Sequence, residues 1–180
     1  RELFLETVTE QVDHAMNVYL DNAATTPMLP EVVEAMLPYM RDHFGNPSST
    51  HQFGRRTKTA IEQSRRQIAG QLGVEPRTVC FTSGGTESDN MALHASVDQL
   101  GCKRILTCAT EHSAVLKTAE HLGKRDDVTC GLLQLDAAGK VDLHHLAITL
   151  SDGIPTVVSV MHGNNEVGIL QDIEAIGQCC

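Results

Sequence analysis

Residues 104–135 read RILTCATEHSAVLKTAEHLGKRDDVTCGLLQL, and this stretch decides the fold. Short apolar runs predict buried strands at Arg104–Cys108 and Val128–Leu135. The segment between them, Ser113–Leu122, is predicted to be a helix. A strand–helix–strand unit of this kind places two parallel strands in one sheet, with the helix on a face of that sheet.

The same alternation extends in both directions along the chain. The further predicted elements are a strand at Thr78–Thr82, helices at Thr86–Leu100 and Asp142–Leu150, a strand at Thr156–Met161 and the start of a helix at Asp172–Cys180. This order predicts an α/β fold with a mostly parallel sheet flanked by helices. Because ligands bind at the carboxyl ends of such strands, we expect the chemistry in the loops after Thr82, Cys108 and Met161.

The N-terminal third of the chain has a different pattern. It predicts a strand at Val18–Leu20 and helices at Pro30–Phe44 and Arg55–Leu72. Pro38 should kink the first helix or mark its true boundary. Residues 1–15 differ from the rest of the chain, and we interpret them as a short N-terminal arm or as sequence upstream of the domain, which we place at 16–180.

Composition excludes several classes of protein. The chain has 14 Lys and Arg against 23 Asp and Glu, a net charge of −9 that disfavours nucleic-acid binding. No apolar run approaches the roughly 20 residues of a membrane span, and no signal peptide is visible, so the cytoplasm is expected. The six cysteines contain no Cys-x-x-Cys pair and are expected to be buried and reduced, and no histidine pair has the spacing of metal ligands.

The first candidate loop, Ser83–Ser88, lies between a predicted strand and a predicted helix. Gly84 and Gly85 let the backbone approach a ligand closely, and a helix N-terminus offers unpaired N–H groups. Thr86 adds a hydroxyl donor, so the loop suits a phosphate monoester. The alternative is an ordinary Gly-Gly turn followed by a capping box formed by Thr86 and Asp89.

The second and third candidate loops carry an imidazole and an amide. His112 could stack on a flat ring or move a proton near neutral pH, or it could be a solvated residue of a helix capped by Thr110. Asn165 could donate to a phenolate or carboxylate oxygen, or the loop could be a turn with a left-handed Asn. Each loop alone has its alternative, but together they match the needs of an anionic aromatic cofactor.

Five motifs in order resemble the cysteine desulfurases of the NifS/IscS branch, which belong to the class V aminotransferase group of fold-type I enzymes that use pyridoxal 5'-phosphate (PLP). The motifs are Tyr19–Pro27, Gly45–Gly54, Phe81–Asn90, Glu111–Leu116 and Ser159–Gly168. The resemblance implies an incomplete PLP-dependent transferase large domain, with residues 16–180 as its N-terminal part.

The resemblance also implies roles for individual residues. Gly85 and Thr86 would hold the PLP phosphate, His112 would stack on the pyridine ring and assist proton transfer as the catalytic residue, and Asn165 would contact the cofactor or the substrate carboxylate. The implied reaction converts L-cysteine to alanine. The sulfur leaves as a persulfide for an acceptor or scaffold protein, as in iron–sulfur cluster assembly, and the complete protein is expected to be a homodimer.

Three features of the family pattern are absent from these 180 residues. The lysine that binds PLP lies in a Ser-x-His-Lys segment, and none of the five lysines here has that context. The aspartate partner of the pyridine nitrogen and the sulfur-accepting cysteine loop are also missing. We therefore expect the chain alone to be inactive and to expose a sheet edge that promotes association. Two alternatives stay open: a non-catalytic truncated homologue that acts as an interaction protein, and a selenocysteine lyase.

Overall fold

The computed structural model describes residues 18–22 and 24–180, so the predicted arm at 1–15 lies outside the described residues. The elements in chain order are α1 (Pro30–Arg41), α2 (Gln52–Leu72), a short 3₁₀ helix (Pro76–Thr78), α3 (Gly85–Asp98), β1 (Arg104–Thr107), α4 (Ser113–Leu122), β2 (Thr129–Leu132), α5 (Leu143–Leu150), β3 (Thr156–Ser159) and α6 (Ile173–Cys179). None of the helices in this part of the chain is both long and apolar enough to cross a bilayer.

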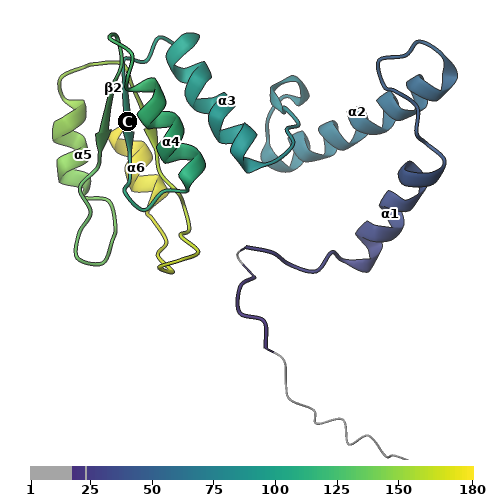
Figure 1. The fold of residues 1–180 in the computed structure, drawn as a ribbon, viewed down its shortest axis with the longest axis horizontal. Coiled ribbons are helices and arrows are strands. Elements are labelled where there is room, and N and C mark those ends of the chain that lie inside the picture. Colours follow the sequence, from purple (N-terminus) through teal and green to yellow (C-terminus); the bar gives the residue numbers. More distant parts are fainter. Residues whose placement is uncertain (1–17, 23) are drawn as a thin grey trace, which may run out of the picture.

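The sheet has three parallel strands in the order β2-β1-β3. The central strand β1 is buried over its whole length, and its Leu106 lies opposite Gly131 of β2 and Val158 of β3. Figure 1 shows helices packed around these strands, while α1 and α2 extend away from them. The prediction of a mostly parallel sheet flanked by helices is confirmed.

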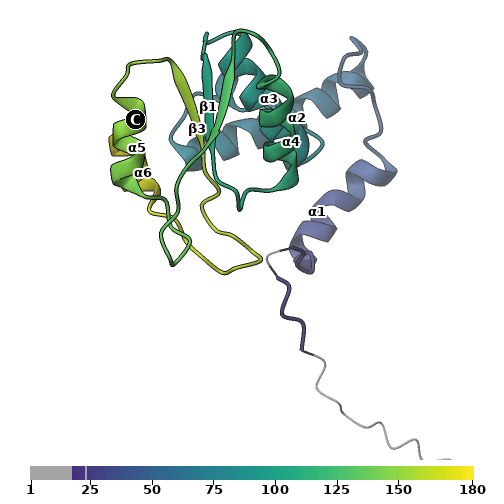
Figure 2. The same cartoon turned by 60° about the vertical axis from the view of Figure 1, so that its left-hand side comes forward.

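Successive side chains of β1 point to opposite faces of the sheet and pack in separate hydrophobic clusters, as expected for a strand buried on both faces. Ile105 packs with residues of α3 and α4, which include Leu93, Val97, Val115, Ala119 and Leu122. Leu106 packs with a second cluster that includes Leu146 of α5 and Ile176 of α6. Figure 2 shows the two helix pairs on opposite sides of the strands.

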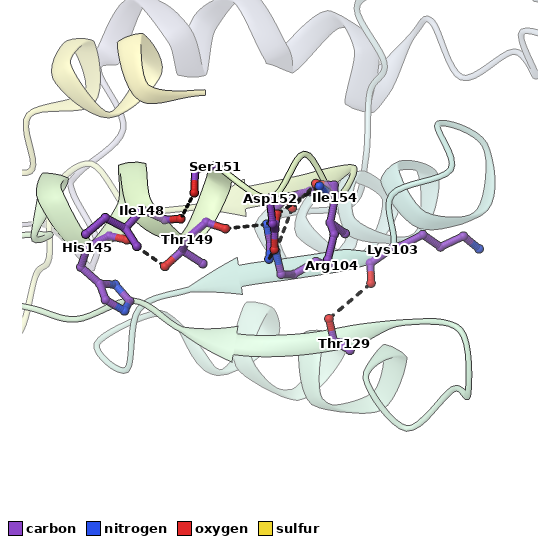
Figure 3. Close-up of polar contacts among 10 residues, drawn as sticks. Lys103, Arg104, Thr129, His145, Ile148, Thr149, Ser151, Asp152 and Ile154 are labelled. Atoms are coloured by element: carbon purple, nitrogen blue, oxygen red, sulfur yellow. Dashed lines mark hydrogen bonds and ion pairs between the residues drawn. The ribbon is translucent and has the colours of Figure 1, made fainter.

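The buried Arg104 connects the amino ends of β1 and β3 to the end of α5 through hydrogen bonds. Arg104 is 9% exposed, and its guanidinium binds both carboxylate oxygens of Asp152 at 2.6 and 2.9 Å. The same group donates to the Thr149 carbonyl and the Thr156 hydroxyl, each at 2.9 Å (Figure 3). These bonds satisfy a buried charge and hold the starts of β1 and β3 side by side.

Two predicted strands are wrong. Thr78 ends the 3₁₀ helix, and the residues that follow it form no ladder; Val18–Leu20 is also irregular. The segment after Thr78 lies beside α2, where Arg65 donates to the Val79 carbonyl and stacks over the Phe81 ring at 4.7 Å. An apolar run becomes a strand only where a neighbouring strand supplies hydrogen bonds, and the described residues offer none at this place.

Helix boundaries also differ from the prediction at the N-terminal end. α1 continues past Pro38 to Arg41, so this proline does not end the helix. α2 begins at Gln52 rather than Arg55, because His51 caps it by accepting a hydrogen bond from the Gly54 N–H. α1 has no buried residue, and most of its large apolar side chains are exposed, while Leu37 is half-buried.

The second core cluster generates a stability prediction. Leu146 is fully buried on α5, whereas Ile148 on the same helix is 58% exposed. We expect Leu146→Ala to lower the free energy of unfolding by about 2–5 kcal/mol, because it leaves a cavity in the core. The matched Ile148→Ala change should cost about 0.5 kcal/mol or less. Urea unfolding followed by circular dichroism measures both, and equal losses would contradict the assigned core.

Candidate functional site

The loops after β1 and β3 are bonded to each other at the carboxyl edge of the sheet. The Asn164 side-chain amide donates to the Thr110 carbonyl at 2.8 Å, and the Glu111 carboxylate accepts the Met161 N–H. β1 and β3 are parallel neighbours, so their carboxyl ends meet at one edge. The loop that carries His112 therefore touches the loop that carries Asn165.

The start of α3 lies on the same side of the fold. Asn90, in the second turn of α3, accepts a hydrogen bond of 2.7 Å from the Thr118 hydroxyl of α4. Asp89 is close enough for its charge to raise the pKa of Glu111. The structure thus joins the loops after β1 and β3 to each other and brings the second turn of α3 close to Glu111.

The first turn of α3 has the features of an anion site. Its N-cap is Gly84, which has no side-chain hydrogen bond, and Ser88 is the first residue to donate back along the helix. The N–H groups of Gly85, Thr86 and Glu87 consequently have no helical acceptor. A side-chain carbon built on Gly84 or Gly85 would meet no atom within 4 Å, so the space beside these two glycines is open.

The predicted alternative for this loop, a capping box formed by Thr86 and Asp89, is wrong. The acid that reaches back is Glu87, whose carboxylate accepts the Ser83 N–H at 2.7 Å and the Ser83 hydroxyl at 2.6 Å. These two bonds lower the pKa of Glu87. They hold the loop in shape and leave the Thr86 side chain exposed.

His112 is the N-cap of α4. The alternative prediction, in which Thr110 caps this helix, is therefore wrong. The Nδ1 atom of His112 accepts the Ala114 N–H at 3.1 Å. A neutral imidazole that accepts through Nδ1 carries its proton on Nε2. The exposed ring therefore has a fixed orientation and one nitrogen free to donate.

The third loop is built on Asn164 rather than on a left-handed asparagine. Its Oδ1 atom accepts the N–H groups of Glu166 and Val167, both at 2.8 Å. Positive φ falls on Gly168, at 71°, and no described residue other than glycine has a positive φ, so the left-handed alternative is wrong. Asn164 is committed to the loop, while the Asn165 side chain is exposed and available to a ligand.

Sequence reasoning missed Glu111 and Asn164 as the residues that join the loops. Glu111 is only 9% exposed, and burial raises the pKa of its carboxyl, against the lowering effect of the Met161 and His112 N–H groups. The sequence did contain a signal for Glu111, because it places an acidic residue directly after a predicted buried strand. A buried carboxylate destabilises the fold unless it accepts hydrogen bonds or forms an ion pair.

The six cysteines differ in their exposure. The expectation of buried cysteines fails for Cys80, Cys130 and Cys180, which are exposed. Cys108 at the end of β1 is 2% exposed, and burial and the Glu111 charge raise its pKa to about 11. No group of three or more His, Cys, Asp or Glu in the described part of the chain could hold a metal ion.

Comparison with known proteins identifies the class. The family model for class V aminotransferases matches residues 18–180. A putative cysteine desulfurase IscS 1 of Bacillus subtilis (strain 168) is 44% identical over 165 residues, which cover 89% of this chain and 42% of that protein. A solved NifS-like protein superposes with a TM-score of 0.83 at 35% identity, over 91% of this chain and 45% of that one.

The chain belongs to the class V aminotransferase family. The prediction of an incomplete fold-type I domain is confirmed, and the chain spans less than half the length of these relatives. Enzymes of this family depend on PLP. The open N–H groups of α3 and the oriented ring of His112 fit a phosphorylated aromatic cofactor.

The state of Cys108 can be tested by thiol labelling. Because only the thiolate is nucleophilic, a buried thiol with a pKa of about 11 should stay unmodified by iodoacetamide at pH 8 in the folded protein. Exposed Cys80 serves as the matched control and should be alkylated. Mass spectrometry of digested protein reads both sites. Alkylation of Cys108 as fast as Cys80 without denaturant would contradict its burial.

Proposed function

We propose that this chain forms the cofactor-binding part of a PLP-dependent cysteine desulfurase. The observation that supports the proposal is the bonded pair of loops after β1 and β3, which carry an oriented imidazole and an amide, with the second turn of α3 close to Glu111. In this assignment Gly85 and Thr86 bind the phosphate, His112 covers the pyridine ring, and Asn165 contacts the cofactor or the substrate carboxylate.

PLP, when bound, supplies an electron sink for the bonds of an amino acid substrate. The proposed role of the residues of this chain is to bind the cofactor and to orient it. The α3 N-terminus would neutralise part of the phosphate charge, and the Nε2–H group of His112 is placed to donate a hydrogen bond to the cofactor or the substrate. His112 is the catalytic residue of the proposal, and its fixed tautomer follows from the bond to Ala114.

The proposed substrate is L-cysteine. One supporting relative is a solved structure titled SspA in complex with cysteine, which superposes with a TM-score of 0.79 at 33% identity over 89% of this chain and 46% of that chain. We propose that the product is alanine and that the sulfur passes as a persulfide to an acceptor or scaffold protein of iron–sulfur cluster assembly. A homodimer and a cytoplasmic location belong to the same proposal, the latter supported by six unpaired cysteines.

A second candidate is a non-catalytic interaction protein. The supporting observation is α1, where no residue is buried and Met36 and Met40 are exposed. Exposed apolar surface of this kind is typical of a surface that binds another chain.

Binding of pyridoxamine 5'-phosphate to the 180-residue chain tests the leading proposal, because this ligand forms no imine with surface lysines. Thr86→Val should weaken binding about tenfold or more, since a hydrogen bond to a charged phosphate is lost. The control is Thr59→Val, which removes an exposed hydroxyl from α2. Fluorescence titration measures both. Equal affinity of Thr86→Val and the unmodified chain would contradict the assignment of Thr86 to the phosphate. Alanine production from cysteine by these 180 residues would contradict the expectation that the chain alone is inactive.

A further inference from the structure

Glu111 is a buried acid that the proposed function leaves unused. The residue is 9% exposed, and its carboxylate accepts the Met161 N–H, a bond that spans 50 residues of sequence. The described residues show no salt bridge from a Lys or Arg to this carboxylate. Burial of a carboxylate without a cationic partner is costly, so its one long-range bond has to be structurally or functionally important.

That bond is one of two between the same loops, and in both the donor lies in the β3 loop and the acceptor in the β1 loop. Glu111, after β1, accepts from the backbone of the β3 loop, and Asn164, in the β3 loop, donates to Thr110 after β1. Two bonds hold two loops in one relative position, where a single bond would act as a pivot. Glu111 is adjacent to His112, and the segment that begins at Met161 leads to Asn165.

We propose that Glu111 is a positioning residue, which holds the β3 loop against the start of α4 and so sets the spacing between His112 and Asn165. The inference rests on the proposed function, since both residues belong to that site. It also adds a requirement: the ligand affinity of the site depends on a side chain that lies beneath the ligand-binding surface.

Three titratable groups face Glu111 from the elements around it. Asp89 of α3 and Cys108, directly after β1, lie close enough to interact electrostatically with it, and His112 is its neighbour in sequence. Burial and Asp89 raise the pKa of Glu111, so its ionised form lowers stability. The unfolded chain ionises first as pH rises, and stability therefore falls between the ordinary pKa of a glutamic acid and the raised value.

The experiment compares Glu111→Ala, Glu111→Gln and a control, Glu120→Ala, which removes an exposed acid from α4. Glutamine keeps an acceptor for Met161 but does not titrate. We expect Glu111→Ala to speed hydrogen exchange of the Met161 amide and to weaken pyridoxamine 5'-phosphate binding, each about tenfold or more. Glu111→Gln should stay within about threefold of the unmodified chain in both, and its stability should lack the loss with rising pH.

The outcomes separate the two proposals. If the unmodified chain does not bind pyridoxamine 5'-phosphate, the proposed function fails, and Met161 exchange still decides whether Glu111 joins the loops. If Glu111→Ala does not fold, the chemical shift of the Met161 amide tests whether Glu111 binds it. This shift should change with pH in the unmodified chain and should not change in Glu111→Gln. Unchanged affinity and exchange in Glu111→Ala, or a Met161 resonance insensitive to pH, would overturn the inference.

Discussion

The parallel pairing of β1 on both of its edges is the constraint on which the rest of the structure depends. β1 lies in register with β2 on one side and β3 on the other, and all four of its residues are buried. Its side chains divide the core into two clusters, one under α3 and α4 and one under α5 and α6. Since parallel strands end at one edge, this pairing also brings the polar loops together.

The loops then hold one another by hydrogen bonds that involve backbone groups. Glu111 and Asn164 each bond to the main chain of the other loop, which leaves the neighbouring His112 and Asn165 exposed. The buried Glu111 and the half-buried Asn164 determine the positions of the loops, and the exposed residues next to them in sequence are available for chemistry. This division explains why adjacent residues, Glu111 beside His112 and Asn164 beside Asn165, have different tasks.

Much of this could be predicted from the sequence, because alternating apolar runs and polar segments are local signals. The bounds of α4 were predicted correctly, and so was the start of β1 at Arg104. The strand at Thr78–Thr82 was not, because pairing depends on a neighbour that a local pattern does not reveal. Caps were also mistaken, since His112 and Glu87 took tasks that short-range rules gave to Thr110 and Asp89. The bonds between loops join residues about 50 positions apart and leave no periodic signal.

The central claim is that three loops act as one site, and amide chemical shifts measured during ligand titration test it most directly. Inorganic phosphate alone should shift the amides of Gly85 and Thr86. Pyridoxamine 5'-phosphate should shift these together with the signals of His112 and Asn165, all with a single dissociation constant. Shifts confined to one loop, or loops that respond with different dissociation constants, would contradict the account.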